Sequence, residues 1–266
     1  MIVVEDLVVE YVTQGGERVR AVDGVSLALR PGERVGLIGP NGCGKTTLAR
    51  CLNALILPSA GRVEVDGIDT RDDSRRVELR QRVGMVFQNP DNQLVAATVE
   101  REIAFGLENL GVPWEQMQVL VEQALRQFGL EQYRKHPPHL LSGGEKQRLA
   151  LAAVSAMRPR YLILDEPTSL LDPVSRDAVV ESALRFGSLA GDADSDQSPA
   201  VLLITQFPEE VLALDRVLVM HRGRLIADDS PKGIFSRVDR LKEIGLEPPV
   251  EFLAEEIWKE GPSVPD

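Results

Sequence analysis

The sequence has few residues that could fix it in a membrane, cross-link it or attract nucleic acid. Its 266 residues include two cysteines, three histidines and 5% aromatic residues. No apolar run approaches the ~20 residues of a membrane-spanning helix, and residues 1–6 lack the basic region of a signal peptide. Cys43 and Cys51 lie in one loop–helix stretch, so we expect no disulfide and a reducing cytoplasm. The net charge of −11 and the pI of about 4.9 argue against non-specific binding to nucleic acid or to anionic membranes.

The alternation of β-rich and helical stretches predicts an α/β protein, with ample material for a core. Strands are expected at 2–4, 7–9, 25–29, 63–66, 83–87, 161–165 and 200–205, followed by a hairpin at 217–227. Helices are expected at 98–128 with a break at Pro113, at 142–157, at 173–186, around 234–244 and at 249–260. We interpret the acidic, turn-rich residues 187–199 as a solvated linker.

The strongest single motif, at residues 39–47, fits the phosphate-binding pattern G-x-x-x-x-G-K-[ST]. It follows an apolar run and precedes a helical pattern, so it has the strand–loop–helix context that the motif requires. Its glycines allow backbone N–H groups to turn towards phosphate oxygens at a helix N-terminus. We expect Lys45 to lie across the β- and γ-phosphates and Thr46 to reach Mg²⁺. The candidate nucleotide contacts are Gly39, Pro40, Asn41, Gly42, Cys43, Gly44, Lys45, Thr46 and Thr47.

Residues 161–166, Tyr-Leu-Ile-Leu-Asp-Glu, form an apolar run that ends in two carboxylates. The lack of polar alternation predicts a parallel strand that is covered on both faces. One interpretation is that the two acids only solvate the strand end. The functional interpretation, which the phosphate loop favours, is that Asp165 belongs to the Mg²⁺ shell and Glu166 deprotonates the attacking water.

A second glycine motif, Leu-Ser-Gly-Gly-Glu-Lys-Gln-Arg at residues 141–148, opens a predicted helix. Ser142 with Glu145 three residues later forms a capping box, which is a purely structural explanation for these two residues. It does not explain Gly143 and Gly144, each of which weakens a helix by up to ~1 kcal/mol unless its backbone must approach another group closely. The start of this helix is therefore a second candidate anion site.

Taken together, these motifs resemble an ATP-binding cassette (ABC) ATPase over residues 1–230. The resemblance implies an α/β P-loop fold with an antiparallel β subdomain, a helical subdomain at about 89–158 and a C-terminal helical extension at 231–266 that contacts a second subunit. It also implies a head-to-tail dimer, in which Ser142, Gly143, Gly144 and Glu145 of one subunit close over ATP on the other.

The same resemblance assigns roles to residues outside the two glycine motifs. Gln88 would sense Mg²⁺ and the attacking water, and residues 169–172 would cross the dimer interface. Tyr11 ends a strand, where an aromatic ring either packs on the core or forms a platform for adenine, and spacing alone leaves both open. The family places its adenine-stacking aromatic at this position, which favours the second.

Three stretches, at residues 87–94, 98–106 and 241–249, resemble the ATPases of energy-coupling factor (ECF) transporters. These prokaryotic importers take up vitamins or cobalt and nickel ions. The resemblance implies an identical or paralogous second ATPase, a transmembrane coupling subunit and a substrate-binding membrane subunit. The chain would then be peripheral, at the cytoplasmic face of the cell membrane, with residues 89–110 forming part of a groove for coupling helices.

One departure from this family concerns Gln206, which occupies the position of the usual histidine after the next strand. Glutamine can donate a hydrogen bond but cannot carry a proton, so we expect a slow yet competent ATPase. A regulatory subunit that binds ATP and hydrolyses it poorly is the alternative. A soluble ABC ATPase acting on DNA or ribosomes is a further one, which the acidic charge and single cassette disfavour. A last hypothesis concerns Cys43, which is either inert or has a lowered pKa in the field of the loop.

Overall fold

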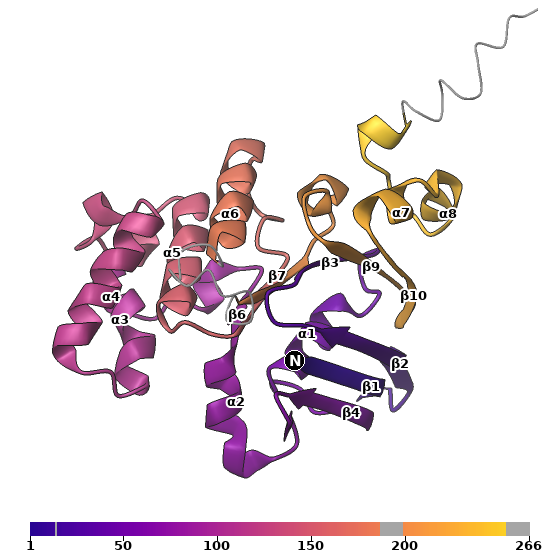
Figure 1. Ribbon diagram of the computed structural model, residues 1–266, viewed down its shortest axis with the longest axis horizontal. Helices are drawn as coiled ribbons and strands as arrows, with labels where there is room; N and C mark the ends of the chain where they lie inside the picture. Colours follow the sequence, from indigo (N-terminus) through magenta and orange to yellow (C-terminus); the bar gives the residue numbers. More distant parts are fainter. Residues whose placement is uncertain (14, 187–198, 254–266) are drawn as a thin grey trace, which may run out of the picture.

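The computed structural model describes residues 1–13, 15–186 and 199–253 and contains two β-sheets with helices packed around them (Figure 1). The larger sheet has the strand order β10-β9-β3-β8-β7-β6. Its strands are β3 (Arg34–Ile38), β6 (Val83–Val86), β7 (Tyr161–Asp165), β8 (Ala200–Ile204), β9 (Arg216–His221) and β10 (Arg224–Asp229). All pair in parallel except β10, which is antiparallel to β9. The carboxyl ends of the five parallel strands therefore meet at the same edge, where such sheets bind ligands.

The prediction of a buried parallel strand before Glu166 is confirmed. Every residue of β7 is buried, and the strand lies between β6 and β8. A strand that is covered on both faces has no solvent-facing side, which is why its sequence shows no polar alternation.

The smaller sheet is antiparallel and has the order β2-β1-β4-β5. Its strands are β1 (Ile2–Val12), β2 (Arg18–Leu29), β4 (Ala60–Val65) and β5 (Ile68–Asp69). The predicted break between residues 2–4 and 7–9 is wrong, because β1 continues through an irregularity at Asp6, whose φ is 45°. Aspartate tolerates this left-handed conformation, so the backbone bends without ending the strand.

Six α-helices flank the two sheets within the described residues of 1–186. They are α1 (Lys45–Leu52), α2 (Arg76–Arg82), α3 (Val99–Asn109), α4 (Trp114–Gln127), α5 (Gly143–Ala156) and α6 (Pro173–Arg185). Helices α3, α5 and α6 are capped by Thr98, Ser142 and Asp172, whose side chains each accept a backbone N–H. Helices α3, α4 and α5 pack on one another at the end of the molecule away from the small sheet (Figure 1).

The C-terminal part differs from its prediction in one respect. The helical stretch expected around 234–244 is divided into α7 (Pro231–Phe235) and α8 (Val238–Glu243), and Ser230 caps the first of these. A further helical turn begins at residue 250, where the rings of Phe235 and Phe252 lie 5.6 Å apart. Nearly all of the predicted linker, 187–198, and the end of the last predicted helix, 254–260, lie outside the described residues. In the part of the chain that the structure describes, no helix combines the length and hydropathy needed to cross a membrane.

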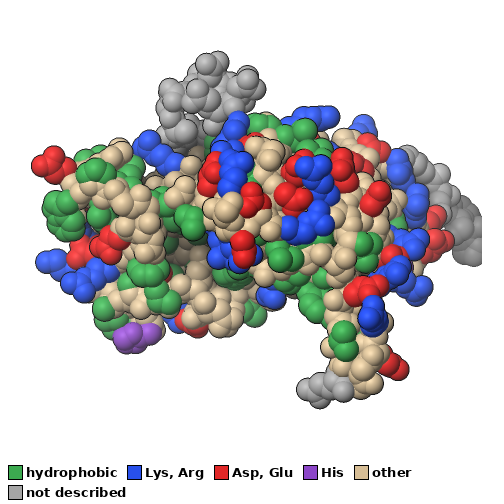
Figure 2. Space-filling view, turned by 90° about the horizontal axis from the view of Figure 1, so that it is seen from below, with side chains coloured by type: hydrophobic (Ala, Val, Ile, Leu, Met, Phe, Trp, Pro, Cys, Tyr) green, Lys and Arg blue, Asp and Glu red, His purple; other side chains and the backbone are tan. Residues whose placement is uncertain are grey.

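Basic and acidic side chains are interleaved on the face shown in Figure 2 and do not gather by sign. Many ion pairs are exposed, for example Arg75 with Glu78 at 2.9 Å. Such pairs contribute only ~0–1 kcal/mol each to stability.

Asp66 differs from these exposed acids, because its side chain is only 9% exposed. Its carboxylate accepts hydrogen bonds from the hydroxyl of Tyr161 at 2.7 Å, from Arg160 at 3.1 Å and from Arg82 at 3.2 Å, and it also binds the amino group of Met1. Burial opposes ionisation, but the hydrogen bonds from Met1 and Tyr161 outweigh it and hold the pKa of Asp66 below its ordinary value. Asp66 thus joins the small sheet to α2 and to the start of β7.

We predict that Asp66→Asn lowers the free energy of unfolding by ~2–3 kcal/mol, since it removes the charge of a buried acceptor that the buried Tyr161 and two arginines share. Because folding lowers the pKa of Asp66, this contribution is present above about pH 4 and is lost as the pH falls through the lower pKa of the folded protein. Urea unfolding at pH 7 measures the loss. The exposed Asp73→Asn change, which breaks an ion pair with Arg76, is the control and is expected to cost less than ~0.5 kcal/mol. Equal losses in the two variants would contradict the prediction.

Candidate active site

The phosphate-loop segment, residues 39–47, connects the carboxyl end of β3 to the start of α1. Two of its glycines are required by close backbone contacts. A Cβ at Gly39 would lie 2.2 Å from the Met220 carbonyl oxygen, and one at Gly44, where φ is 107°, would lie 2.1 Å from the Ala21 carbonyl oxygen. A residue with a side chain at either position would force this loop, which precedes the N-terminus of α1, to move.

Lys45 is the first residue of α1 and is only 4% exposed. Its ammonium donates to the carbonyl oxygens of Gly39 at 2.8 Å and Pro40 at 3.2 Å, and it lies 3.4 Å from Oε1 of Glu166. The loop therefore holds this charge over its own backbone, beside the strand-end acids. A phosphate oxygen at this position would be a stronger partner than a neutral carbonyl, because the hydrogen bond would join two charged groups.

Thr46 and Asp165 are brought together by α1 and β7. The hydroxyl of Thr46 donates to Oδ1 of Asp165 at 2.9 Å. Asp165 is 3% exposed, and this burial raises the pKa of its carboxyl although the hydrogen bond from Thr46 opposes the shift. A nearby cation would favour the charged form, and hydroxyl and carboxylate oxygens are ligands that Mg²⁺ prefers. These two residues therefore fit a magnesium ion.

Glu166 follows β7 with a φ of 49°, an uncommon conformation for a residue other than glycine. Its N–H donates to the Ile204 carbonyl at 2.9 Å, which fixes the turn against β8. The amide of Gln88, just beyond β6, donates to Oε2 of Glu166 at 3.3 Å and to the hydroxyl of Ser169 at 3.0 Å. The carboxylate thus lies between the ammonium of Lys45 and the amide of Gln88.

Gln206 follows β8, in a loop that is held by its neighbours. The hydroxyl of Thr205 donates to Glu210 at 2.6 Å and accepts the N–H of Phe207 at 3.0 Å. The guanidinium of Arg176 lies 3.9 Å from the centre of the Phe207 ring. The backbone on both sides of Gln206 is therefore fixed, next to the strand that carries Glu166.

Tyr11 is the aromatic residue beside the phosphate-loop segment. Its hydroxyl lies 3.3 Å from Oγ1 of Thr47, while 42% of the residue is exposed. The ring of Tyr11 is therefore not packed in the core. An exposed ring at the edge of a phosphate-binding loop is available for stacking on a base.

The hypothesis that the phosphate loop lowers the pKa of Cys43 is wrong, because the pKa is raised. Burial raises the pKa of this thiol and outweighs the opposing effect of Lys45, and 5% of the residue is exposed. Burial also raises the pKa of Cys51 to about 12. The loop does supply a positive field, but it does not compensate for the loss of hydration around the sulfur.

We therefore predict that N-ethylmaleimide labels neither cysteine of the folded protein within an hour at pH 7, with or without ATP. Both cysteines should react once the chain is unfolded in guanidinium chloride. Intact mass spectrometry counts the adducts, and rapid labelling of native Cys43 would show that the thiolate forms despite its burial.

Ser142, Gly143, Gly144 and Glu145 begin α5, and the predicted capping box is confirmed. The N–H of Ser142 donates to Glu145 at 2.8 Å, and the N–H of Glu145 donates to the Ser142 hydroxyl at 3.4 Å. A Cβ at Gly144 would lie 2.9 Å from the hydroxyl of Ser175, so packing against α6 explains this glycine. Gly143 has only an ordinary contact with its own chain, at 3.4 Å from Leu171.

The phosphate-loop segment and the start of α5 belong to different parts of the chain. Helix α1 packs on β2, β4 and β7, whereas α5 packs on α3, α4, α6 and β6. Figure 1 shows α1 beside the small sheet and α5 beside α4 and α6.

Sequence reasoning missed a buried polar residue that connects α5 to the segment after β6. This residue is Gln147, which is 1% exposed and shares the buried face of α5 with Gly144, Leu151 and Val154. Its position on an otherwise apolar face, at helical spacing, was the available signal, because a buried amide needs a hydrogen-bond partner.

A phosphate loop after β3, a hydroxyl–carboxylate pair and a second carboxylate at neighbouring strand ends together define a nucleoside-triphosphate-hydrolysing protein of the P-loop class. Comparisons with known proteins narrow this class. The family model described as "ABC transporter" matches residues 22–169. An "Energy-coupling factor transporter ATP-binding protein EcfA1" of Clostridium perfringens is 46% identical over 98% of this chain and 91% of its own length. A "Cobalt import ATP-binding protein CbiO" of Syntrophus aciditrophicus is 49% identical over 92% of this chain and 84% of its own length.

Solved structures agree with these relatives. CbiO1 from Clostridium perfringens, described as part of the ABC transporter complex CbiONQ, matches with a TM-score of 0.77 and 32% identity over 96% of this chain and 98% of that one. A dimeric post-hydrolysis structure of the ATP-binding cassette MJ0796, bound to ADP and Pi, matches with a TM-score of 0.76 and 25% identity over 87% of this chain and 99% of that one. The chain belongs to the ABC transporter family, among the ATP-binding proteins of energy-coupling factor transporters. The predicted fold class is confirmed, and the activity is ATP hydrolysis coupled to transport.

Proposed function

We propose that this protein is the motor subunit of an importer for a vitamin or a transition-metal ion, peripheral at the cytoplasmic face of a prokaryotic membrane. The observation that carries the proposal is the convergence of Lys45, Glu166 and Gln88 at the carboxyl edge of the large sheet. The names of the relatives, which refer to energy-coupling factor transport and to cobalt import, support the substrate class.

In this proposal the phosphate-loop residues bind ATP. Lys45 exchanges its carbonyl partners for oxygens of the β- and γ-phosphates, and the N–H groups of residues 39–47 surround the phosphates. Thr46 and Asp165 would hold Mg²⁺, with Gln88 contributing from the loop after β6. When bound, the metal neutralises charge on the phosphate oxygens.

Glu166 is the proposed general base. Its carboxylate accepts a proton from the attacking water, and its neighbours Lys45 and Gln88 keep it directed towards the γ-phosphate. Gln206 donates a neutral hydrogen bond to that phosphate. Gln88 also binds Ser169, so it connects the carboxylate to the loop that leads into α6.

A complete site needs a second subunit, identical or paralogous. We propose a head-to-tail dimer in which Ser142, Gly143 and Gly144 of one subunit close over ATP on the other, with Glu145 fixing the helix start. The room at Gly143 is consistent with the approach of a group from outside the chain. The related cassette that is dimeric with ADP and Pi bound supports the pairing of two subunits. Tyr11 stacks on adenine.

We place the nucleotide-binding domain at residues 1–230, with a helical subdomain at about 89–158. Residues 231–266 form the extension that we propose as an additional dimer contact. The EcfA1 relative of Clostridium perfringens matches 98% of this chain, so the extension belongs largely to the shared part of the sequence.

The groove for a transmembrane coupling subunit is proposed along residues 89–110. One cavity of 450 Å³ is lined both by Thr46, Gln88 and Asp165 and by Asn89 and Asn92. It therefore adjoins the proposed metal ligands and the start of the segment that we expect the coupling helix to contact.

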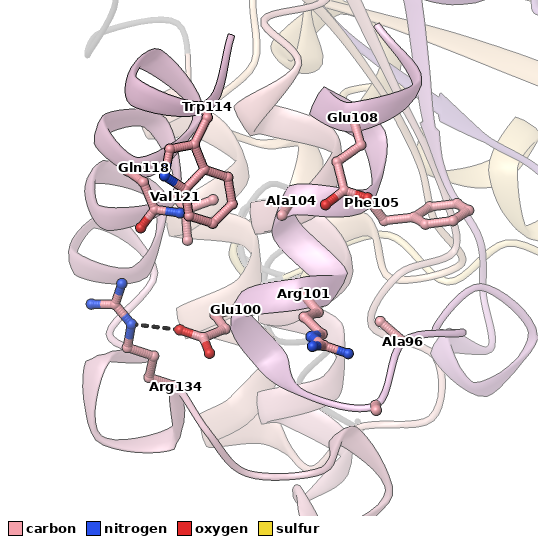
Figure 3. A pocket seen from close by; sticks show the side chains of 11 residues that line it. Ala96, Glu100, Arg101, Ala104, Phe105, Glu108, Trp114, Gln118, Val121 and Arg134 are labelled. Carbon is pink, nitrogen blue, oxygen red and sulfur yellow. Dashed lines mark hydrogen bonds and ion pairs between the residues drawn. The ribbon is translucent and has the colours of Figure 1, made fainter. Parts of the chain in front are cut away.

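A second cavity, of 520 Å³, is lined by Ala104 and Phe105 of α3 and by Trp114 of α4, and the ring of Phe105 points away from the ring of Trp114 (Figure 3). Glu100 and Arg134, joined at 2.8 Å, close its base. Phe105 is 48% exposed and Trp114 is 67% exposed. Exposed aromatic rings with a polar border are typical of a surface that receives an apolar helix face. The substrate-binding membrane subunit would be reached through the coupling subunit.

The proposal is tested by magnesium-dependent ATP turnover of the purified protein, followed by co-purification with the coupling subunit in detergent. Phe105→Glu should reduce co-purification at least about tenfold, because it places a charge in an apolar contact. Val119→Glu is the matched control, since Val119 is 54% exposed on α4 but does not line the cavity. Absence of turnover by the wild-type protein would contradict the ATPase assignment, and equal recovery of the two variants would contradict the docking surface.

We predict that Gln206→His raises the rate of ATP hydrolysis about tenfold. A charge-assisted hydrogen bond of ~1.5–3 kcal/mol would replace a neutral one of ~1 kcal/mol in the transition state. The fixed loop between Thr205 and Phe207 keeps the change local. Steady-state turnover at saturating ATP measures it, and Gln206→Leu should be slower than the wild type. An unchanged rate in the histidine variant would contradict the idea that Gln206 is what slows hydrolysis.

A further inference from the structure

Gln147 lies on α5, little more than one turn after Ser142, and is 1% exposed. Its side-chain amide donates to the carbonyl oxygen of Phe87 at 3.2 Å. On the other backbone group of the same residue, the N–H of Phe87 donates to the side-chain carbonyl of Gln93, also at 3.2 Å. Two glutamine side chains therefore hold Phe87 by both of its backbone groups.

Phe87 is the residue immediately before Gln88. Since the Gln88 amide reaches Glu166 at 3.3 Å and Ser169 at 3.0 Å, a displacement of Phe87 changes the distance and angle of both hydrogen bonds. Such bonds weaken steeply when their geometry is lost.

The connection to α5 is reinforced on the surface by an ion pair between Lys146 and Asp91 at 2.7 Å. The segment around Gln88 is thus joined to α5 at two successive residues, Lys146 and Gln147, and the inner connection is shielded from water.

We propose that Gln147 is a positioning residue that ties the orientation of α5 to the position of Gln88. This inference rests on the proposed function, in which the first residues of α5 close over ATP bound to the partner subunit. Closure of α5 on the partner's nucleotide then sets the geometry around Glu166 in its own subunit through Gln147 and Phe87. The two nucleotide sites of the dimer are coupled in this way, and hydrolysis at one depends on closure at the other.

The test is a double-mutant cycle with Gln147→Met and Gln88→Ala, read as ATP turnover of the dimer. Methionine has a similar length and no amide, so Gln147→Met removes the donor without opening a cavity. Alone it should lower kcat about tenfold and reduce the Hill coefficient for ATP towards one, with ATP affinity within about twofold of the wild type. In the Gln88→Ala background the same substitution should have no further effect, because both act through one group.

A purely structural role for Gln147 predicts a different pattern. The melting temperature and the active fraction would fall, the Hill coefficient would stay unchanged, and the two substitutions would be additive. Gln123→Met, on the exposed face of α4, controls for the loss of a glutamine and should match the wild type in all readouts. If Gln147→Met does not fold, Gln93→Met carries the test, since it releases Phe87 from the opposite side.

Two results would overturn the inference. One is additivity between Gln147→Met and Gln88→Ala, and the other is a wild-type Hill coefficient in an otherwise slow Gln147→Met dimer. Both are distinguishable from failure of the proposed function, which would appear as absent ATP turnover in the wild-type protein itself.

Discussion

Replacing Glu166 with glutamine is expected to slow ATP hydrolysis about a thousandfold while ATP binding is retained. A general base contributes about 10²–10⁴-fold to a rate, and glutamine keeps the shape of the side chain but cannot accept the proton of water. The substitution leaves the backbone hydrogen bond to Ile204 in place and preserves an oxygen near Lys45. Because hydrolysis then no longer separates the subunits, ATP should hold the dimer together.

Turnover of this variant is measured by phosphate release, and dimerisation by light scattering after gel filtration with ATP and Mg²⁺. Glu115→Gln, an exposed change on α4, is the matched control and should behave as the wild type in both. Turnover of Glu166→Gln within about threefold of the wild type would refute Glu166 as the base, since no general base has so small an effect. If Glu166→Gln is inactive but stays monomeric with ATP, Glu166 would keep its assignment as the general base. The proposal that ATP holds two subunits together would then be refuted.

The sequence predicted those parts of the site that are formed by residues adjacent in the chain. The phosphate-loop segment has its glycines, Lys45 and Thr46 in fixed places, and the buried strand before Glu166 identifies its own carboxyl end. In each such motif the same short stretch of sequence supplies the functional side chains and the backbone that orients them. The geometry of the motif can therefore be predicted without knowing the rest of the fold.

The parts that could not be predicted depend on side chains that meet across the fold. The amide of Gln88 joins Glu166 and Ser169, which are about eighty residues away in sequence, and Gln147 holds Phe87 from a separate helix. Neither the spacing nor the hydropathy of these residues encodes the contact. Cys43 shows the same limit for electrostatics, because its pKa depends on how completely the surrounding chain excludes water.

Replacing Lys45 with methionine is expected to weaken ATP binding about a hundredfold or more. The ammonium is positioned over the loop by the carbonyl oxygens of Gly39 and Pro40, and it is the only basic side chain within the phosphate-loop segment. Charge-assisted hydrogen bonds are worth ~1.5–3 kcal/mol each, so two contacts with phosphate oxygens account for such a loss. Binding is measured with a fluorescent ATP analogue without Mg²⁺, so that the metal ligands do not contribute.

The conservative variant Lys45→Arg separates charge from position. A guanidinium is larger and planar, and the 4% exposure of Lys45 leaves no room for it beside Glu166 without moving the loop. We therefore expect Lys45→Arg to lose nearly as much affinity as Lys45→Met, whereas the exposed Lys135→Met should bind ATP as the wild type does. Full affinity in the arginine variant would show that any positive charge suffices, and full affinity in the methionine variant would remove Lys45 from the phosphate site. The expected pattern makes the backbone of the loop, which fixes where the ammonium lies, as important to ATP binding as the charge itself.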